Sequence, residues 1–181
     1  MRAKKVPVPK SLPIVVRKAP GSATRALVGI GPLHFPAAIG KAGRSAFKRE
    51  GDGATPIAPM RLLRGHWRAD RIARPVTSLP MTPIAADMLW CDAPGHALYN
   101  RPARSPLAAS HERMMREDHL YDICLVMDWN VVSRRQGRGS AIFFHLARPG
   151  LAPTEGCIAI RLADMRRLLA LVKKGTMVRA L

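Results

Sequence analysis

The stretch GSAIFFHLARPGLAPTEGCIAIR (139–161) determines the fold that we expect for this chain. It holds two apolar runs, at 141–147 and 157–161, and between them the glycine- and proline-containing segment 148–156. Apolar runs of roughly four to eight residues that are bounded by turn residues are typical of buried strands. We therefore expect two neighbouring strands joined by the loop 148–156.

These two runs carry a histidine and a cysteine. His145 stands near the end of the first run, and Cys157 opens the second, directly after Gly156. Neighbouring strands would bring imidazole and sulfur close together, as in a Cys–His nucleophile and base. A neighbouring imidazole can lower the pKa of a thiol from ~8.5 into roughly the 3.5–7.5 range. A buried histidine and a buried cysteine are also ordinary core residues, so spacing alone leaves both interpretations open.

Further strand signals run through most of the chain. The runs 12–18 and 24–31 are split by Pro20 and Gly21 and predict a hairpin. The other expected strands are 33–39, 60–64, 67–72, 121–130 and 176–181. The 181 residues include 16 prolines and 14 glycines, which favours many turns over long helices.

Helical periodicity is confined to short segments. An apolar stripe predicts a helix near the C-terminus, and it consists of Met165, Leu168, Leu169 and Val172. We expect Asp164 in its first turn, Lys173 and Lys174 in its last turn, and Gly175 just past its end. The segment 110–118, with Ser110 as N-cap, predicts a second helix. The sequence thus predicts a mainly β domain with about eight strands and one or two short helices.

The length suits a single domain. We expect a basic, flexible arm at 1–11 and one domain over 12–181, acting as a monomer. The N-terminus starts basic, but prolines and charges interrupt any apolar core, so no ordinary signal peptide is readable. No stretch approaches the ~20 apolar residues of a transmembrane helix. By sequence alone the location therefore defaults to the cytoplasm.

The chain is strongly basic. It has 30 Lys and Arg against 12 Asp and Glu, a formal charge of +18. Such a charge implies an anionic partner, which could be nucleic acid, anionic lipid or a carboxylate-rich polymer such as a bacterial cell wall. Solubility and a high use of arginine are the plainer explanation. Because no helix-turn-helix, zinc-finger or RNA-recognition pattern is visible and aromatic residues are few, no nucleic acid is expected.

The cysteines do not form a recognisable framework. Cys91, Cys124 and Cys157 are an odd number, which argues against closed disulfide pairing. No CxxC or HxxxH spacing occurs, so we expect neither a metal nor another cofactor. Cys91 and Cys124 suit a role as small buried apolar residues.

The first stretch resembles the active-site segment of the L,D-transpeptidase (YkuD-type) catalytic domain family. That pattern is a histidine, a loop, and then Ser/Thr-x-Gly-Cys, matched here by His145, Thr154, Gly156 and Cys157. Three more stretches resemble family segments in the same order, namely GDGATPIAP (51–59), WCDAPGHALYN (90–100) and HERMMREDHLYDICLVMDWN (111–130). The resemblance covers about residues 12–181.

The resemblance implies a β-sandwich or barrel-like catalytic domain and a peptidoglycan substrate. It implies that Cys157 attacks the amide after the L-centre of diaminopimelate and expels a terminal D-residue, leaving an acyl-enzyme. His145 would be the base and later the acid, oriented by the main-chain carbonyl of Leu146. The backbone N–H groups of Glu155, Gly156 and Cys157 would form the oxyanion hole.

The acceptor of the acyl group stays open. An amine of another stem peptide would make a 3–3 or 1–3 cross-link, and a protein amine is a further possibility. Water would make the protein an L,D-carboxypeptidase or amidase, and a basic nucleic-acid-binding module is the non-enzymatic alternative. The resemblance also implies donor and acceptor stem peptides as partners, carbapenems as inhibitors, and the periplasm or cell envelope as location.

Several other residues are candidates for binding the stem peptide. They are Tyr99, Asn100, His111, Arg138, Ser140 and Thr154. Each has a plainer interpretation: Tyr99 and Asn100 could cap a strand, His111 could lie on a solvated helix face, and Arg138 could be a solvated turn arginine rather than a bidentate partner of a carboxylate.

Three positions depart from common family residues, namely Leu146, Glu155 and Ala159. The carboxylate of Glu155 would oppose a nearby thiolate or hold an incoming ammonium group. A role through the backbone carbonyl tolerates leucine at 146.

Overall fold

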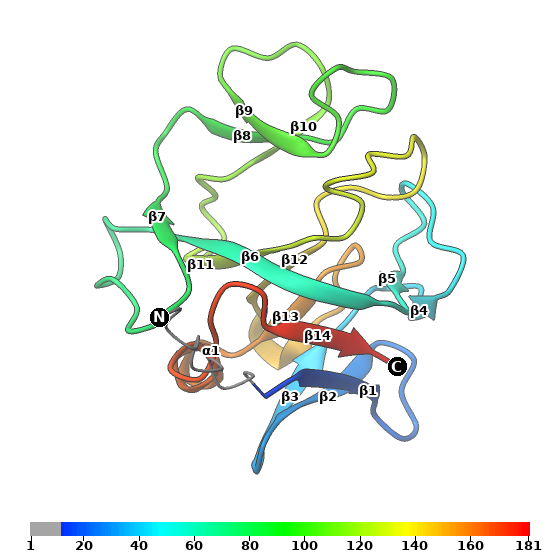
Figure 1. Ribbon diagram of the computed structural model, residues 1–181, viewed down its shortest axis with the longest axis vertical. Coiled ribbons are helices and arrows are strands. Elements are labelled where there is room, and N and C mark those ends of the chain that lie inside the picture. Colours follow the sequence, from blue (N-terminus) through cyan, green and yellow to red (C-terminus); the bar gives the residue numbers. More distant parts are fainter. Residues whose placement is uncertain (1–11) are drawn as a thin grey trace, which may run out of the picture.

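Short strands and tight turns build a closed β barrel in the computed structural model, which describes residues 12–181 (Figure 1). The barrel strands are β1 (Ile14–Lys18), β2 (Arg25–Ile30), β3 (Leu33–Ala38), β6 (Pro59–Trp67), β11 (Ile123–Met127), β12 (Phe143–Leu146), β13 (Ile158–Ile160) and β14 (Met177–Ala180). They run in the order β11-β12-β13-β3-β2-β1-β14-β6, and pairing of β6 with β11 closes the barrel. β7 (Met81–Pro83) adds to the outer edge of β6.

Smaller elements surround the barrel. A three-stranded sheet lies beyond one side of it (top of Figure 1) and consists of β8 (Met88–Cys91), β9 (Arg101–Arg104) and β10 (His111–Arg113). A short parallel pair is formed by β4 (Arg44–Ser45) and β5 (Thr55–Pro56). The helical elements are α1 (Leu162–Leu169) and a 3-10 turn at Pro149–Leu151. The expected mainly β, barrel-like fold is confirmed, whereas the expected arm at 1–11 lies outside the described residues.

Strand alternation divides the buried side chains into two cores. In β12, Phe144 and Leu146 point into the barrel, where they join the main apolar cluster with α1. Phe143, one residue before Phe144, points outward into a second cluster with Trp90 and Cys157, beneath the three-stranded sheet. Successive side chains of a strand face opposite sides, so His145 shares the outer face with Phe143. The three-stranded sheet covers this outer core, and polar groups are buried there.

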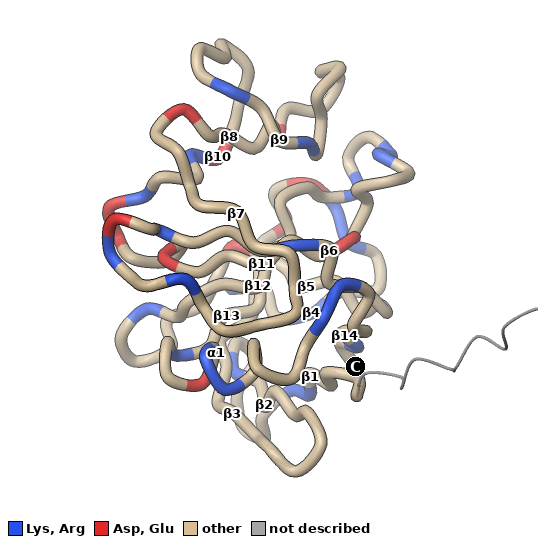
Figure 2. Tube along the Cα trace, turned by 60° about the vertical axis from the view of Figure 1, so that its left-hand side comes forward, with Lys and Arg blue, Asp and Glu red and all other residues tan. Residues whose placement is uncertain are grey.

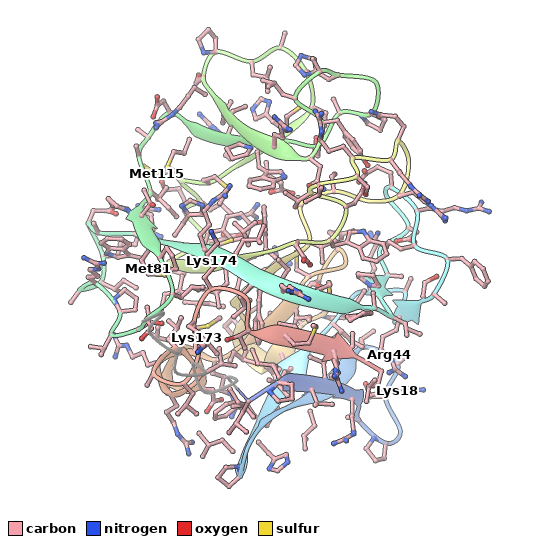
Figure 3. The ribbon with its side chains drawn as sticks, in the orientation of Figure 1. Lys18, Arg44, Met81, Met115, Lys173 and Lys174 are labelled. Carbon is pink, nitrogen blue, oxygen red and sulfur yellow. The ribbon has the colours of Figure 1, made fainter. Side chains whose placement is uncertain are left out.

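Several expected elements are confirmed with shifted ends. The hairpin across Pro20 and Gly21 forms, with β1 antiparallel to β2. The C-terminal helix forms and buries Met165, Leu168 and Leu169 against the barrel. It ends at Leu169, however, so its last turn holds arginines, and Lys173 and Lys174 lie in the turn that leads to β14 (Figure 3).

Two expectations about elements are wrong. The segment 110–118 is not a helix, because residues 111–113 pair with β8 as strand β10 and Met114 N–H donates to the carbonyl of Met88. Pairing with a neighbouring strand outweighs the weak helical pattern of this segment. The two strands expected at 60–64 and 67–72 are one strand, β6, which ends at Trp67.

The cationic side chains are dispersed. Figure 2 shows Lys and Arg on barrel strands, on loops and on the small sheet, without one continuous stripe in that view. Within residues 12–181, no helix is long and apolar enough to span a membrane.

Candidate active site

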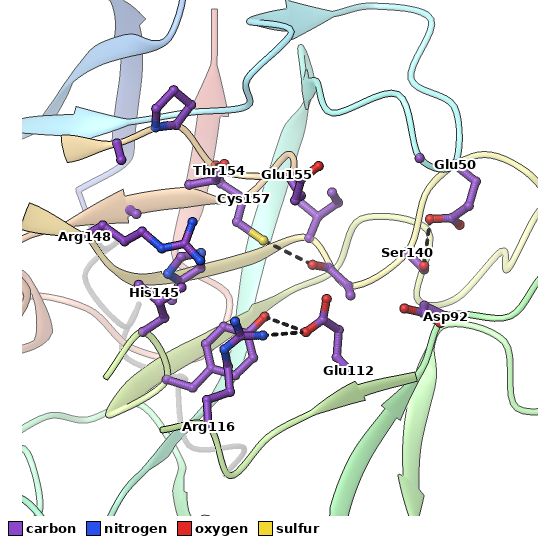
Figure 4. A pocket seen from close by; sticks show the side chains of 18 of the residues that line it. Glu50, Asp92, Glu112, Arg116, Ser140, His145, Arg148, Thr154, Glu155 and Cys157 are labelled. Atoms are coloured by element: carbon purple, nitrogen blue, oxygen red, sulfur yellow. Dashed lines mark hydrogen bonds and ion pairs between the residues drawn. The ribbon is translucent and has the colours of Figure 1, made fainter. Parts of the chain in front are cut away.

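Strands β12 and β13 bring the predicted histidine and cysteine to one face. They are parallel neighbours, with His145 opposite Ala159 and Phe144 opposite Ile158. Cys157 directly precedes β13 and is therefore in step with Phe143, on the outer face of the barrel. The two neighbouring strands and the connecting loop agree with the sequence prediction, and both side chains line one cavity (Figure 4).

This cavity has a volume of about 230 Å³. Its walls come from the loop 48–51, the three-stranded sheet, and the segments on either side of β12 and β13. The charged and hydroxyl-bearing side chains in its wall are Lys48, Glu50, Asp92, Glu112, Arg116, Tyr121, Ser140, Arg148, Thr154 and Glu155. These polar groups share the wall with apolar side chains, which include Leu120, Ile142 and Pro153.

His145 is held in one tautomer and one orientation. Its Nδ1 lies 2.8 Å from the carbonyl oxygen of Leu146, and because a carbonyl can only accept, Nδ1 carries the proton. The ring also meets Tyr121 edge to face at 5.4 Å between centroids. Nε2 is therefore left as the basic nitrogen. Burial lowers the pKa of His145 to about 4, so the imidazole is neutral at pH 7.

The sulfur of Cys157 is placed by two backbone groups. Sγ donates to the carbonyl of Ala141 at 3.3 Å and accepts from the N–H of Phe143 at 3.3 Å. Burial raises the pKa of the thiol to about 12, although the N–H of Phe143 favours the thiolate. In the described part of the chain no hydrogen bond joins Sγ to His145. The resting pair is thus a neutral thiol and a neutral imidazole, which differs from the ionised thiol expected from the sequence.

Hydrogen bonds of threonine side chains stabilise the turn before Cys157. Thr154 Oγ1 donates to the carbonyl of Cys157 at 2.6 Å and accepts from the N–H of Gly156 at 3.2 Å. Thr55 Oγ1 donates to the same Cys157 carbonyl at 3.4 Å. At Gly156 φ is +134°, and a Cβ would lie 2.9 Å from the carbonyl oxygen of Ala54. The segment 51–59 therefore supports the turn from behind, and only glycine fits at position 156.

Charged side chains of both signs line the cavity. Figure 4 shows Arg148 beside His145, and Glu50 and Asp92 beyond the sulfur on the other side. Arg116 and Glu112 lie below the sulfur and are joined at 3.1 Å. A ligand that carries both an ammonium and a carboxylate group would be oriented by this arrangement.

Of the residues predicted to bind substrate, the structure brings Ser140 and Thr154 to the cavity and places the others elsewhere. Tyr99 is buried and donates from its hydroxyl to Glu50. Asn100 is buried and accepts from Trp90 Nε1 at 3.0 Å. His111 Nδ1 faces the carbonyl of Ala109.

Arg138 lines a second, separate hollow on the protein surface, together with Trp129 and Arg135. The glutamate side chain at 155 is exposed and pairs with Lys41 at 2.7 Å, which offsets its repulsion of a thiolate.

Seven charged or hydroxyl-bearing side chains of the cavity wall were not among the predicted site residues: Lys48, Glu50, Asp92, Glu112, Arg116, Tyr121 and Arg148. Glu112 and Arg116 fall in the segment 110–118, which was predicted as a helix, and Tyr121 opens the predicted strand 121–130. A β pattern there would have turned every second side chain inward. Arg148 lies two residues after the end of β12, and nothing in its sequence context distinguishes it from other arginines.

Comparison with known proteins gives one finding. The family model described as L,D-transpeptidase catalytic domain (YkuD) matches residues 14–179, nearly the whole chain. No curated protein and no solved structure matches. Among the described residues, no group of three or more His, Cys, Asp or Glu side chains is arranged to hold a metal ion.

Proposed function

Since the chain belongs to the YkuD family of L,D-transpeptidase catalytic domains, which act on peptidoglycan peptides at the cell envelope, we propose that it is a peptidoglycan L,D-transpeptidase with Cys157 as nucleophile. The observation that carries this proposal is the common cavity of Cys157 and His145, with His145 Nδ1 fixed on the Leu146 carbonyl. That bond directs the basic Nε2 away from the backbone and makes it available to the thiol proton.

Acylation begins from the neutral pair. The thiol proton leaves its hydrogen bond with the Ala141 carbonyl and passes from Sγ to Nε2 of His145, as Sγ attacks the carbonyl carbon of the donor peptide. The N–H of Phe143, already 3.3 Å from Sγ, stabilises the negative charge on sulfur during this step. His145 then gives its proton to the departing amine of the D-residue, the C–N bond breaks, and a thioester remains.

The oxyanion of the tetrahedral intermediate is assigned to the backbone N–H groups of the turn, at Glu155, Gly156 and Cys157. The N–H of Gly156 has a partner in the resting state, Thr154 Oγ1 at 3.2 Å, so it must be shared with the oxyanion. Each preorganised donor of this kind contributes on the order of 10²–10³ in rate. Thr154 and Thr55 fix the turn and so fix these donors.

The acyl group passes to an amine of a second stem peptide in this proposal, as a 3–3 or 1–3 cross-link. The polar cavity supports such a substrate, because stem peptides carry ammonium and carboxylate groups that its acidic and basic side chains would bind. A cell-wall substrate also places the protein in the periplasm, makes carbapenems plausible acylating inhibitors, and gives the charge of +18 a polyanionic partner.

The test is intact-mass detection of an acyl adduct after incubation with a carbapenem, followed by turnover of a tetrapeptide muropeptide. We expect one adduct on the wild type, none on Cys157→Ser, and no turnover by that variant. Cys91→Ser is the matched control, since Cys91 also lies near a histidine, with Sγ 3.6 Å from His96 Nδ1, but outside the cavity. Full turnover by Cys157→Ser would overturn the proposal, and trimmed monomers in place of dimers would show hydrolysis.

A further inference from the structure

Glu112 presents a carboxylate oxygen to the cavity. Its Oε2 accepts from Arg116 Nη1 at 3.1 Å and from the Tyr121 hydroxyl at 3.4 Å. All hydrogen bonds of this side chain within residues 12–181 fall on Oε2. Figure 4 shows the other oxygen directed upward into the cavity, toward Cys157. Arg116 and Tyr121 thus fix the carboxylate and leave one oxygen for a ligand.

A second carboxylate faces the same space without a partner. Asp92 lines the cavity, and its Oδ1 is buried with no hydrogen-bond partner in the described part of the chain. The negative charge of Asp92 also raises the pKa of Glu112, although burial of Glu112 contributes more. Glu50, by contrast, is already engaged, because one oxygen accepts from Ser140 at 3.0 Å and the other from Tyr99. A cation between Asp92 and Glu112 would satisfy both groups.

An ammonium group that binds there must lose protons before and during its reaction with the thioester. An amine acceptor arrives as ammonium at neutral pH, since α-amino groups have a pKa near ~8. It must release one proton to become nucleophilic and a second one as the amide forms. His145 can hold only one of these at a time. Water needs to lose only one proton before the thioester is hydrolysed, so the second base matters for amines alone.

We propose that Glu112 binds the ammonium group of the acceptor and takes its first proton, and thereby selects an amine over water. This inference rests on the proposed function, because it requires a thioester at Cys157. Asp92 assists by binding the same ammonium group and does not exchange a proton.

The step balances as follows. One proton passes from the ammonium group to Oε1 of Glu112 and leaves a neutral amine. The amine nitrogen forms a bond to the thioester carbonyl carbon, the C–S bond breaks, and the second proton passes through His145 to the sulfur. The products are the new amide, the thiol of Cys157 and the protonated Glu112, which returns its proton to solvent at the cavity mouth. A carboxylate whose pKa is raised by burial is better suited to this exchange than an exposed one.

The experiment uses the full chain with a tetrapeptide muropeptide as both donor and acceptor. Two quantities are measured by mass spectrometry: the rate of release of the terminal D-residue in the first turnover, and the ratio of dimers to trimmed monomers. The variants are Glu112→Gln, which keeps the shape and removes the base, and Glu112→Asp. Glu117→Gln is the matched control, since it removes one negative charge from an exposed position in the same segment.

We expect Glu112→Gln to lower the dimer-to-monomer ratio by about 10²-fold, a far larger loss than any in the first-turnover release of the D-residue. Glu112→Asp recovers part of the ratio, and Glu117→Gln matches the wild type. An unchanged ratio in Glu112→Gln overturns the inference. An equal loss of first-turnover release and of transfer also overturns it, because Glu112 would then act on the thiol. A wild type that forms no thioester contradicts the proposed function instead.

Discussion

The inner and outer faces of β12 and β13 differ although they share the same two strands. On the inner face Phe144 and Ile158 lie opposite each other and are fully buried in the barrel core. On the outer face, one residue away in each strand, His145 and Cys157 are nearly as buried but line a polar cavity. The side chains of the two faces are thus similarly buried, and only the outer face holds the proposed catalytic residues.

The difference arises from what covers each face. The inner face is covered by the barrel itself and by α1, which supply only apolar side chains. The outer face is covered by the three-stranded sheet and the loop 48–51, which supply charged groups. A register slip by one residue would exchange the two faces, so the site depends on the register of β12 against β13.

The largest effect on stability should come from the inner face. Phe144→Ala removes a ring from a closed core with little room to collapse, so we expect a loss of about 3–5 kcal/mol in the free energy of unfolding. His145→Gln, on the adjacent residue, should abolish acylation and cost far less stability. Urea unfolding of both variants checks this. A larger loss in His145→Gln than in Phe144→Ala would contradict the division into two faces.

The β architecture could be predicted from sequence because it depends on local signals. The runs around Phe144 and Ile158, the break at Pro20 and the stripe at Met165 each carry their pattern within a few residues. Strand β10 could not be predicted in this way, because its three residues are defined by pairing with β8 and not by their own periodicity. Closure of the barrel by β6 against β11 is likewise a long-range contact.

The same distinction applies to the site. His145 and Cys157 were predictable because one short loop connects them. The carboxylates that face them come from β10 and the end of β8. No spacing along the chain predicts that these segments lie close to His145 and Cys157. The neutral resting state was also not predictable, since it follows from the depth of burial of both groups and from the bond between Sγ and Ala141.

The neutral pair makes the thiol slow toward simple alkylation. With the pKa of Cys157 raised to about 12 by burial, its thiolate fraction at pH 7 is lower than that of a free cysteine by about 10³-fold. Iodoacetamide should therefore label Cys157 at a rate that keeps rising through pH 10, as followed by peptide mass spectrometry. A rate that is already at a plateau between pH 5 and 8 would show an ion pair with His145 instead.

Acid should destabilise the outer face. His145 and His66 flank Cys124 in one row across β12, β11 and β6, and burial lowers the pKa of each to about 4. The unfolded state, with a pKa near ~6.5, takes up the protons first as pH falls. Each histidine therefore contributes stability above pH 6.5 that declines by about 3 kcal/mol on approach to pH 4.

His66 is the better residue for testing this dependence, because it lies outside the cavity that holds His145 and Cys157. His66→Gln should show a smaller loss of stability between pH 7 and pH 4 than the wild type, as measured by urea unfolding at each pH. The same slope in both proteins would mean that His66 is already charged in the folded state.

The smallest of these effects concerns the turn before Cys157, which contains Gly156. Gly156→Ala places a Cβ 2.9 Å from the carbonyl of Ala54 at a φ of +134°, so we expect a loss of about 2 kcal/mol together with loss of acylation. Gly150→Ala is the matched control in the same loop, with φ of +69° and no atom within 4 Å of the added Cβ. It should cost about 1 kcal/mol from backbone strain alone and should leave acylation intact. Equal losses of stability and of acylation in the two variants would show that the close approach to Ala54 does not hold the turn, and the oxyanion donors would then need another support.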